Sequence, residues 1–314
     1  MAVDEHVSQL LAGLEAQGVP PFSQMSIGQI RETIASFTGM QLPAQEVADV
    51  TRLDYAGGDG TSLPLRVYTP NTQGPRPVVL YFHGGGFVAG DLDVVDEPAR
   101  AVANATGATV VTAAYRLAPE HAFPAASDDA TAALHWVVDN IADHGGNPDN
   151  VVLMGDSAGG NLAVSTALRA RDTQGPHITA LVLIYPALHP NADLPSRTEF
   201  TEGYLLGAAD MDFFWKNYLQ KPEDANNPYA VPPIADLTGL PATLVVTTEN
   251  EVIRDEAEQF ADSLRAAGVE CRHTRLDGLV HGVFWLSGAI PRSSEIQDAV
   301  ADFVREVTAE TAPR

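Results

Sequence analysis

The stretch that decides the fold of this chain is VVLMGDSAGGN, residues 151–161. An apolar run leads directly into Gly155-Asp156-Ser157-Ala158-Gly159 and then into a helical pattern, and G-x-S-x-G between a strand and a helix is typical of a nucleophile elbow. The glycines lack a Cβ atom, so a sharp turn can lift the serine hydroxyl above the edge of a sheet. The alternative for such a motif is a tight packing turn, but the strand and the helix around it favour Ser157 as a nucleophile.

Apolar runs on both sides of this stretch predict a parallel sheet, because strands covered by helices on both faces are apolar on both faces. They lie at residues 78–82, 109–113, 151–154, 181–185 and 243–247, with helical patterns between them at 97–106, 127–142, 161–171, 253–267 and 294–308. Two alternating segments, 50–53 and 63–68, flank a glycine-rich turn and predict an antiparallel hairpin before the first of these runs. The expected fold class is α/β, with a mostly parallel sheet flanked by helices in a doubly wound domain.

Two segments interrupt this alternation. Residues 1–45 are helical in composition and precede the first strand, and residues 188–227 hold one expected helix at 209–219 that is rich in aromatic residues. Such a helix is compatible with ordinary core packing, but its position in the chain favours a lid over a pocket. We therefore predict an N-terminal cap at 1–45 on a body at 46–314, with a cap insertion at 188–227.

A second motif, His83-Gly84-Gly85-Gly86-Phe87, follows the apolar run at 78–82. Glycines at the end of a strand allow backbone N–H groups to approach a developing oxyanion, with the N–H of Ala158 converging from the elbow. A turn or a phosphate-binding loop is the alternative, but a phosphate loop needs Lys followed by Ser or Thr, and neither follows here. The two motifs in this order predict an oxyanion hole.

A serine hydroxyl needs a base, and in this type of fold the chain order is serine, acid, histidine. The histidines after Ser157 are His177, His189, His273 and His281. Only His281 lies in a loop after an expected strand, which ends at residue 276, so it is the predicted base. The acid is expected on the loop at 248–256, which contains several carboxylates, and spacing alone does not decide between them.

Composition excludes several other classes of protein. The chain has 314 residues, 45% of them hydrophobic, and carries 18 Lys and Arg against 41 Asp and Glu, a net charge of −23. A chain this acidic would be repelled by the phosphate backbone of a nucleic acid, and its apolar content is too high for a disordered chain. The expected partners are a small-molecule substrate and, among proteins, a second copy in a homodimer, with no nucleic acid and no membrane.

Cysteine content and targeting signals also restrict the class. One cysteine, Cys271, excludes an intramolecular disulfide, and it is expected to be buried in a strand. The start of the chain lacks the basic and apolar segments of a signal peptide, and no apolar run approaches the ~20 residues of a membrane span. These features predict a cytoplasmic location.

The chain resembles the bacterial hormone-sensitive-lipase-like esterases of the α/β-hydrolase superfamily. The resemblance extends from about residue 66 to residue 285 and rests on HGGGF at 83–87, YRLAPE at 115–120, FPAA at 123–126, GDSAGGN at 155–161, NPYA at 227–230 and HG at 281–282. It implies a serine carboxylesterase with a helical cap and no cofactor. It also implies Ser157 as nucleophile, His281 as base, and an oxyanion hole formed by the N–H groups of Gly84, Gly85, Gly86 and Ala158.

The same resemblance assigns the acid. The family's acid loop usually reads Asp-Pro-Leu-x-Asp with the first Asp catalytic, whereas this chain has Glu251-Val252-Ile253-Arg254-Asp255. The aligned position is Glu251, which is the predicted acid, and Asp255 is the reserve.

The substrate is less constrained by the sequence than the catalytic groups are. Phe87, Tyr204 and Phe214 are predicted to contact it, in the company of Phe213 and Trp215, and small dissolved esters with short to medium acyl chains are favoured. Two alternatives stay open: a non-catalytic receptor on the same scaffold, as in the plant gibberellin receptors that lack the histidine, and an amidase, peptidase or lactonase that uses the same triad. A metal-dependent hydrolase is not indicated, because no cluster at ligand spacing such as H-E-x-x-H occurs.

Overall fold

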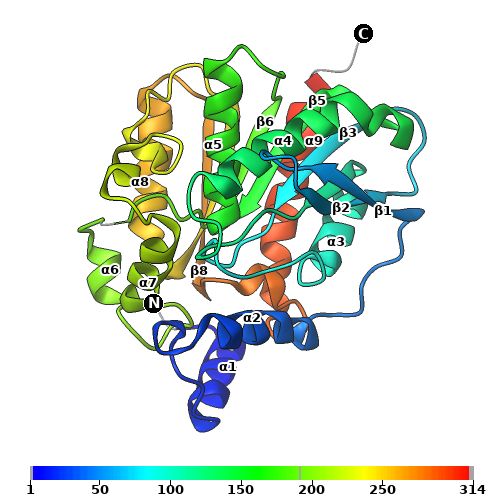
Figure 1. The fold of residues 1–314 in the computed structure, drawn as a ribbon. Helices are drawn as coiled ribbons and strands as arrows, with labels where there is room; N and C mark the ends of the chain where they lie inside the picture. The colour runs from blue at the N-terminus through cyan, green and yellow to red at the C-terminus, as the bar shows by residue number, and fades with distance from the viewer. Residues whose placement is uncertain (1–2, 191, 311–314) are drawn as a thin grey trace.

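The computed structural model describes residues 3–190 and 192–310, whose strands form one eight-stranded sheet in the order β1-β2-β4-β3-β5-β6-β7-β8 (Figure 1). The strands are β1 Asp49–Ala56, β2 Ser62–Thr69, β3 Arg76–Phe82, β4 Thr109–Ala113, β5 Gly146–Asp156, β6 Ala180–Ile184, β7 Ala242–Asn250 and β8 Cys271–Val280. The hairpin β1–β2 and the pair β2–β4 are antiparallel, and the pairs from β4 to β8 are parallel. The predicted α/β fold class with an antiparallel hairpin at the start of the sheet is confirmed.

Helices cover both faces of this sheet. They are α3 Asp96–Thr106, α4 Ala125–Asn140, α5 Ala158–Asp172, α8 Arg254–Ala266 and α9 Ser294–Glu310. Helices α3 and α9 contact each other on one face, and α4 and α5 contact each other on the opposite face (Figure 1). The central strands β3, β4 and β6 are almost fully buried because both of their faces are covered, as their uninterrupted apolar sequences require.

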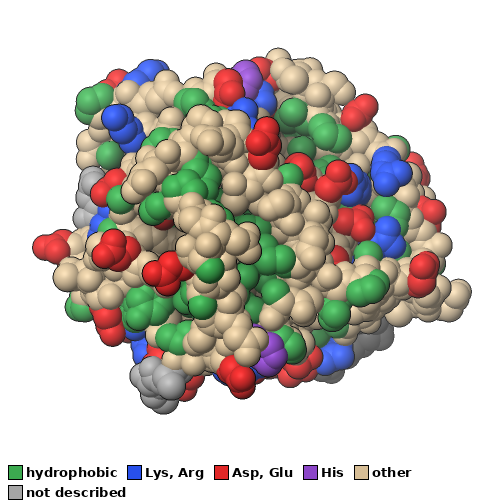
Figure 2. Space-filling model, turned by 90° about the horizontal axis from the view of Figure 1, so that it is seen from below, with side chains coloured by type: hydrophobic (Ala, Val, Ile, Leu, Met, Phe, Trp, Pro, Cys, Tyr) green, Lys and Arg blue, Asp and Glu red, His purple; other side chains and the backbone are tan. Residues whose placement is uncertain are grey.

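Two helical segments lie together at the carboxyl end of the parallel strands, at the bottom of Figure 1. The first, here called the N-terminal cap segment, contains α1 Glu5–Ala16, a 3₁₀ turn at Phe22–Gln24, α2 Ile27–Ser36 and a second 3₁₀ turn at Phe37–Met40. The second, the inserted cap segment, contains α6 Pro195–Glu199 and α7 Ala208–Tyr218. Seen from this side, the molecule shows hydrophobic side chains toward the middle of the face and acidic ones around them (Figure 2).

Local sequence explains where the helices of the N-terminal cap segment begin. The side chain of Asp4 accepts the N–H of His6 at 2.9 Å and so caps α1. Ser26 and Gln29 form a reciprocal capping box at the start of α2. Helix α2 then buries Ile30 and Ile34, one turn apart on the same face.

Several element boundaries differ from the predicted ranges, and two of these differences lie next to Ser157 and His281. Helix α5 begins at Ala158 and not at residue 161. The prediction placed the start too late because Gly159 and Gly160, which form the first turn, are weak helix formers. Strand β8 continues past residue 276 to Val280, across a shift in its pairing with β7, so His281 directly follows the strand. Cys271 is only half-buried, because β8 is the edge strand of the sheet.

Within the described part of the chain, no helix is both long enough and apolar enough to span a bilayer. The cytoplasmic location stays a prediction from the sequence.

Candidate active site

Ser157 occupies a strained turn between β5 and α5. Its φ is +53°, a left-handed value that non-glycine residues seldom adopt, and it is the N-cap residue of α5. The turn is tight on both sides: a Cβ atom at Gly155 would lie 2.1 Å from the carbonyl oxygen of Gly159, and one at Gly159 would lie 2.0 Å from that of Phe82. Glycine at these two positions therefore permits the turn that presents the Ser157 hydroxyl.

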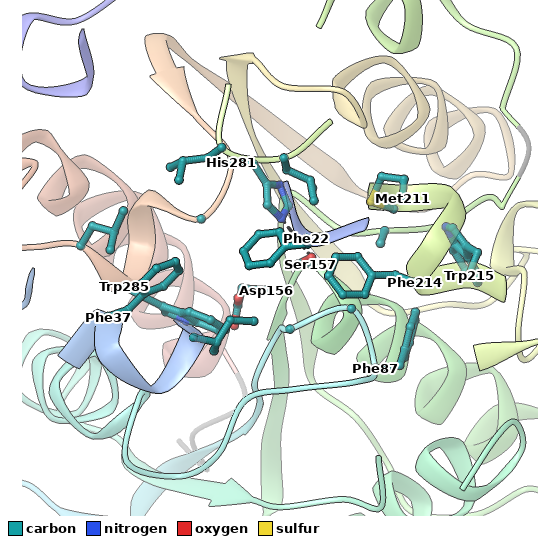
Figure 3. A pocket seen from close by; sticks show the side chains of 18 residues that line it. Phe22, Phe37, Phe87, Asp156, Ser157, Met211, Phe214, Trp215, His281 and Trp285 are labelled. Carbon is teal, nitrogen blue, oxygen red and sulfur yellow. Dashed lines mark hydrogen bonds between the residues drawn. The ribbon is translucent and has the colours of Figure 1, made fainter. Parts of the chain in front are cut away.

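His281 lies between Ser157 and a carboxylate. Its Nε2 is 3.0 Å from Ser157 Oγ (Figure 3). Its Nδ1 is 2.8 Å from Glu251 Oε2. All three side chains are buried, Glu251 completely. The ring of Tyr185 packs against the imidazole at a centroid distance of 4.5 Å, and Tyr185 Oη accepts the N–H of Phe284, so the imidazole is also held from the side.

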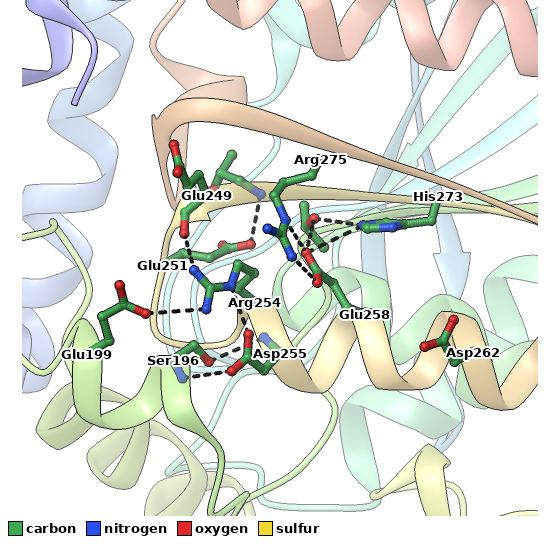
Figure 4. A network of polar contacts seen from close by, with 12 residues as sticks. Ser196, Glu199, Glu249, Glu251, Arg254, Asp255, Glu258, Asp262, His273 and Arg275 are labelled. Atoms are coloured by element: carbon green, nitrogen blue, oxygen red, sulfur yellow. Dashed lines mark hydrogen bonds and ion pairs between the residues drawn. The ribbon is translucent and has the colours of Figure 1, made fainter. Parts of the chain in front are cut away.

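The loop after β7 presents Glu251 to His281 and turns Asp255 away. The second oxygen of Glu251 accepts the N–H of Thr248 at 3.0 Å, which fixes the carboxylate. Asp255 instead accepts the N–H of Ser196 and the Nε–H of Arg254, each at 2.8 Å (Figure 4). The structure thus brings Glu251, and not the reserve Asp255, into contact with the histidine.

The other histidines that follow Ser157 lie elsewhere. His177 is exposed, and the Nε2 of His273 is 2.9 Å from Thr247 Oγ1. The backbone N–H of His189 donates to Glu256 at 3.2 Å. Of the four candidates, His281 is the one within hydrogen-bond reach of Ser157.

The glycine loop after β3 has the backbone freedom that an oxyanion hole requires. Gly85 and Gly86 have φ values of +106° and +63°, and the Tyr115 hydroxyl donates to the carbonyl oxygen of His83 at 2.7 Å at the base of the loop. The N–H of Gly84 already donates to Asp156 Oδ1 at 3.1 Å. The N–H of Gly84 is therefore not available to an oxyanion. The remaining predicted donors are the N–H groups of Gly85, Gly86 and Ala158, the first residue of α5.

Asp156 is a buried carboxyl that the sequence analysis did not single out. Its Oδ1 accepts the hydroxyl of Tyr81 at 2.7 Å in addition to the N–H of Gly84, and Tyr81 Oη in turn accepts Trp285 Nε1–H at 3.3 Å. Burial raises the pKa of Asp156 to about 7, although the hydrogen bond from Tyr81 opposes that shift. Asp156 thus connects the glycine loop to the segment that follows His281. The sequence feature that could have identified Asp156 is its position directly before the nucleophile.

An apolar cavity opens directly above these groups (Figure 3). It is lined by Phe22, Ile34, Phe37, Gly85, Gly86, Phe87, Asp156, Ser157, Ala187, Leu205, Leu206, Met211, Phe214, Trp215, His281, Gly282, Trp285 and Leu286. These residues include no lysine and no arginine. The two cap segments thus supply much of the wall around Ser157.

Of the predicted substrate-contacting residues, Phe87 and Phe214 line this cavity, and Tyr204 does not. The ring of Tyr204 packs edge-on against Phe200 at a centroid distance of 5.0 Å. The backbone turns at Leu205, whose φ is +68°, so that Leu205 and the next residue reach the cavity in place of the tyrosine.

The N-terminal cap segment contributes three wall residues that the sequence did not predict, Phe22, Ile34 and Phe37. The sequence of α7 does contain a usable pattern, because its buried hydrophobic residues recur at positions 211, 214, 215 and 218. This helical spacing excludes Phe213 from the buried face. No local sequence pattern predicts that Phe22 lines the cavity, because its contact partners come from distant segments.

A family model described as the alpha/beta hydrolase fold matches residues 79–285, which is most of the chain and includes the glycine loop, Ser157, Glu251 and His281. The chain belongs to the α/β-hydrolase family. Within that family this hydrolase is a member of the hormone-sensitive-lipase-like branch, as the sequence motifs predicted.

Individual relatives of this hydrolase are esterases by name. It is 39% identical to the carboxylesterase NlhH of Mycobacterium tuberculosis over 245 residues, 76% of this chain and 77% of the relative. It is 32% identical to an arylesterase of Saccharolobus solfataricus over 283 residues, 90% of this chain and 92% of the relative. Among solved structures, a hyperthermophilic esterase from the archaeon Pyrobaculum calidifontis superposes with a TM-score of 0.92 at 36% identity, covering 98% of this chain and 99% of that one.

Proposed function

We propose that this carboxylic ester hydrolase cleaves short- to medium-chain acyl esters by a Ser157–His281–Glu251 triad through an acyl-enzyme intermediate. The observation that carries the proposal is the position of His281, which is 3.0 Å from Ser157 Oγ and 2.8 Å from Glu251 Oε2 at the base of an apolar cavity. A serine next to a base that is itself held by a carboxylate is the arrangement that activates a hydroxyl as a nucleophile.

In the first half of the reaction, Ser157 Oγ attacks the ester carbonyl carbon while His281 Nε2 takes the hydroxyl proton. The Glu251 carboxylate accepts Nδ1–H, which keeps Nε2 free to act as the base and stabilises the imidazolium once it forms. The N–H groups of Gly85, Gly86 and Ala158 would donate to the oxyanion of the tetrahedral intermediate. When this intermediate collapses, the bond to the alcohol oxygen breaks and His281 returns the proton to that oxygen.

In the second half, water attacks the acyl group on Ser157 while His281 takes one of its protons. Collapse of this second tetrahedral intermediate releases the carboxylic acid and restores the Ser157 hydroxyl with the proton from His281. The residues that line the cavity include no lysine and no arginine that could bind a carboxylate. The cavity therefore favours a neutral ester as the substrate and release of the acid as its anion.

The proposal is tested with p-nitrophenyl esters of acetate, butyrate and octanoate, together with one amide and one lactone. We expect the butyrate ester to be hydrolysed by the native protein, and Ser157→Ala to lower kcat by at least about 10⁴-fold, since this removes the nucleophile. A serine-directed organophosphate should label Ser157, as seen by peptide mass spectrometry. Ester turnover that is undiminished in Ser157→Ala would overturn the proposal, and hydrolysis of the amide or the lactone alone would change the reaction class.

A further inference from the structure

The two cap segments are joined to each other by the carboxylate of Asp210, which lies in the first turn of α7. Asp210 Oδ1 accepts the backbone N–H of Ser23 at 2.7 Å, and Oδ2 accepts the backbone N–H of Gly207 at 3.0 Å. Ser23 belongs to the N-terminal cap segment and Gly207 is the N-cap of α7, so the two oxygens bind opposite sides of one seam. Asp210 is buried, with 2% of its surface exposed, so its carboxylate is shielded from bulk water.

The seam that Asp210 holds is a wall of the cavity. Phe22 directly precedes Ser23, and Phe214 lies one turn after Asp210 on the same face of α7. The two rings meet at a centroid distance of 5.8 Å, and both line the cavity at Ser157 (Figure 3). The carboxylate therefore sets how closely the Phe22 ring approaches the Phe214 ring.

The Phe214 ring has little room to move away from Phe22, because the glycine loop lies on its other side. A Cβ atom at Gly86 would lie 2.4 Å from the Phe214 ring, so this ring already rests against the glycine loop. If the N-terminal cap segment separates from α7, the space opens between Phe22 and Phe214, and not between Phe214 and the loop.

We propose that Asp210 is a specificity-determining positioning residue, which fixes the width of the substrate cavity by tying Ser23 to the start of α7. The inference rests on the proposed esterase function and adds to it the element that limits acyl-chain length. Asp210 touches neither the reacting atoms nor the substrate, and acts through the position of Phe22.

The test substitution is Asp210→Asn. A carboxylate offers acceptors to both N–H groups, whereas an amide replaces one of them with an NH₂ donor that faces an N–H group. The seam then loses one hydrogen bond and gains a donor–donor contact. Asp212→Asn is the matched control, because Asp212 lies on the same helix, carries the same charge and pairs at the surface with Arg197, away from the cavity.

We expect Asp210→Asn to raise the chain-length ratio, which is kcat/KM for the octanoate ester divided by kcat/KM for the acetate ester, by about tenfold. The change should appear in KM. A displacement of a wall residue by about 1 Å has an effect of this order or larger. Turnover of the acetate ester should stay within about threefold of native, and Asp212→Asn should keep the native ratio. Limited proteolysis should also cut the N-terminal cap segment faster in Asp210→Asn than in the control. A native chain-length profile in folded Asp210→Asn would overturn the inference.

A second substitution, Phe22→Ala, addresses the same seam without touching the carboxylate. Phe22→Ala should raise the chain-length ratio in the same direction. The double variant, Asp210→Asn with Phe22→Ala, should have nearly the same ratio as Phe22→Ala alone, since both substitutions act through the Phe22 ring. If Asp210→Asn does not fold, an unchanged ratio in Phe22→Ala overturns the inference and a raised ratio supports it. If neither the native protein nor Asp212→Asn hydrolyses any ester, the proposed function itself fails, which is a separate outcome.

Discussion

At the scale of single residues, the chain departs most from the family pattern at Glu251, the acid of the proposed triad. A glutamate reaches one methylene further than an aspartate, and here the Thr248 N–H holds the second oxygen of Glu251 while the first meets His281. Asp255, four positions later, serves a different purpose: it accepts the N–H of Ser196 and so connects the acid loop to the start of α6.

This difference predicts the ranking of three substitutions. Glu251→Gln should lower kcat/KM for p-nitrophenyl butyrate by about 10³- to 10⁴-fold, because an amide does not stabilise the imidazolium. Glu251→Asp should lower kcat/KM less, since the charge is kept and only the distance between the carboxylate and His281 increases. Asp255→Asn should stay within about tenfold of native, because Asp255 acts only on loop order. Steady-state kinetics on the three purified variants measures the ranking, and an inactive Asp255→Asn beside an active Glu251→Gln would reverse the assignment.

At the scale of elements, the N-terminal cap segment is firmly attached to the body and is not a loose lid. Arg31 of α2 forms a two-pronged pair with Glu120 at 2.9 and 2.7 Å, and its Nε donates to the carbonyl oxygen of Val88 at 3.0 Å. The carbonyl oxygen of Met40 accepts the N–H groups of Gly288 and Ala289. These contacts hold the segment against the loops that surround the active site.

Deletion of residues 1–45 should therefore change substrate preference more than catalysis. The deletion removes Phe22, Ile34 and Phe37 from the cavity wall but leaves Ser157 and His281 in place. We expect acetate ester turnover within about tenfold of native and a clear gain for longer acyl chains relative to acetate. Aggregation is an expected complication because the deletion exposes apolar surface, so size-exclusion chromatography accompanies the assay. A monodisperse truncated protein with the native chain-length profile would show that these helices do not shape the cavity.

At the scale of the whole molecule, the free energy of unfolding should depend on pH through a buried carboxyl outside the proposed triad. Glu256 on α8 accepts the N–H groups of Leu188 and His189, and burial raises its pKa from an ordinary value of 4.5 to about 8 despite these two bonds. The folded protein therefore holds a proton that the unfolded chain releases over this range. Because the unfolded chain binds fewer protons, the free energy of unfolding should fall as pH rises from about 4.5 to about 8, and Asp156 contributes in the same direction up to about 7.

Glu256→Gln should flatten this decline. Urea denaturation at pH 5, 6.5 and 8 should give a smaller loss of stability for Glu256→Gln than for the native protein, with a difference in slope below ~1.4 kcal/mol per pH unit. Glu258→Gln is the control on the same helix, since Glu258 pairs with Arg275 at the surface. Equal slopes in the native protein and Glu256→Gln would show that Glu256 is not protonated in the folded state.

The sequence by itself determined the α/β alternation, the elbow at Ser157, the glycine loop and His281. Each of these rests on a local signal: apolar runs of strand length, glycines where the backbone must turn sharply, and a histidine that follows a strand. Local patterns also predict α7. The start of α5 and the end of β8 differ from the prediction, because glycines in a sequence resemble turn residues even where the helix or strand continues through them.

Only the tertiary structure decided which glycine N–H groups are free and which aromatic rings line the cavity, and it separated the predicted acid Glu251 from the reserve Asp255. Asp255 is drawn away by Ser196, the N–H of Gly84 is taken by Asp156, and Phe22 is held against Phe214 through Asp210. In each case the deciding partner lies more than fifty residues away along the chain. Hydrogen-bond acceptors and cavity walls are shared between distant segments, so a reading of neighbouring residues does not reveal which of several chemically equivalent groups is already engaged.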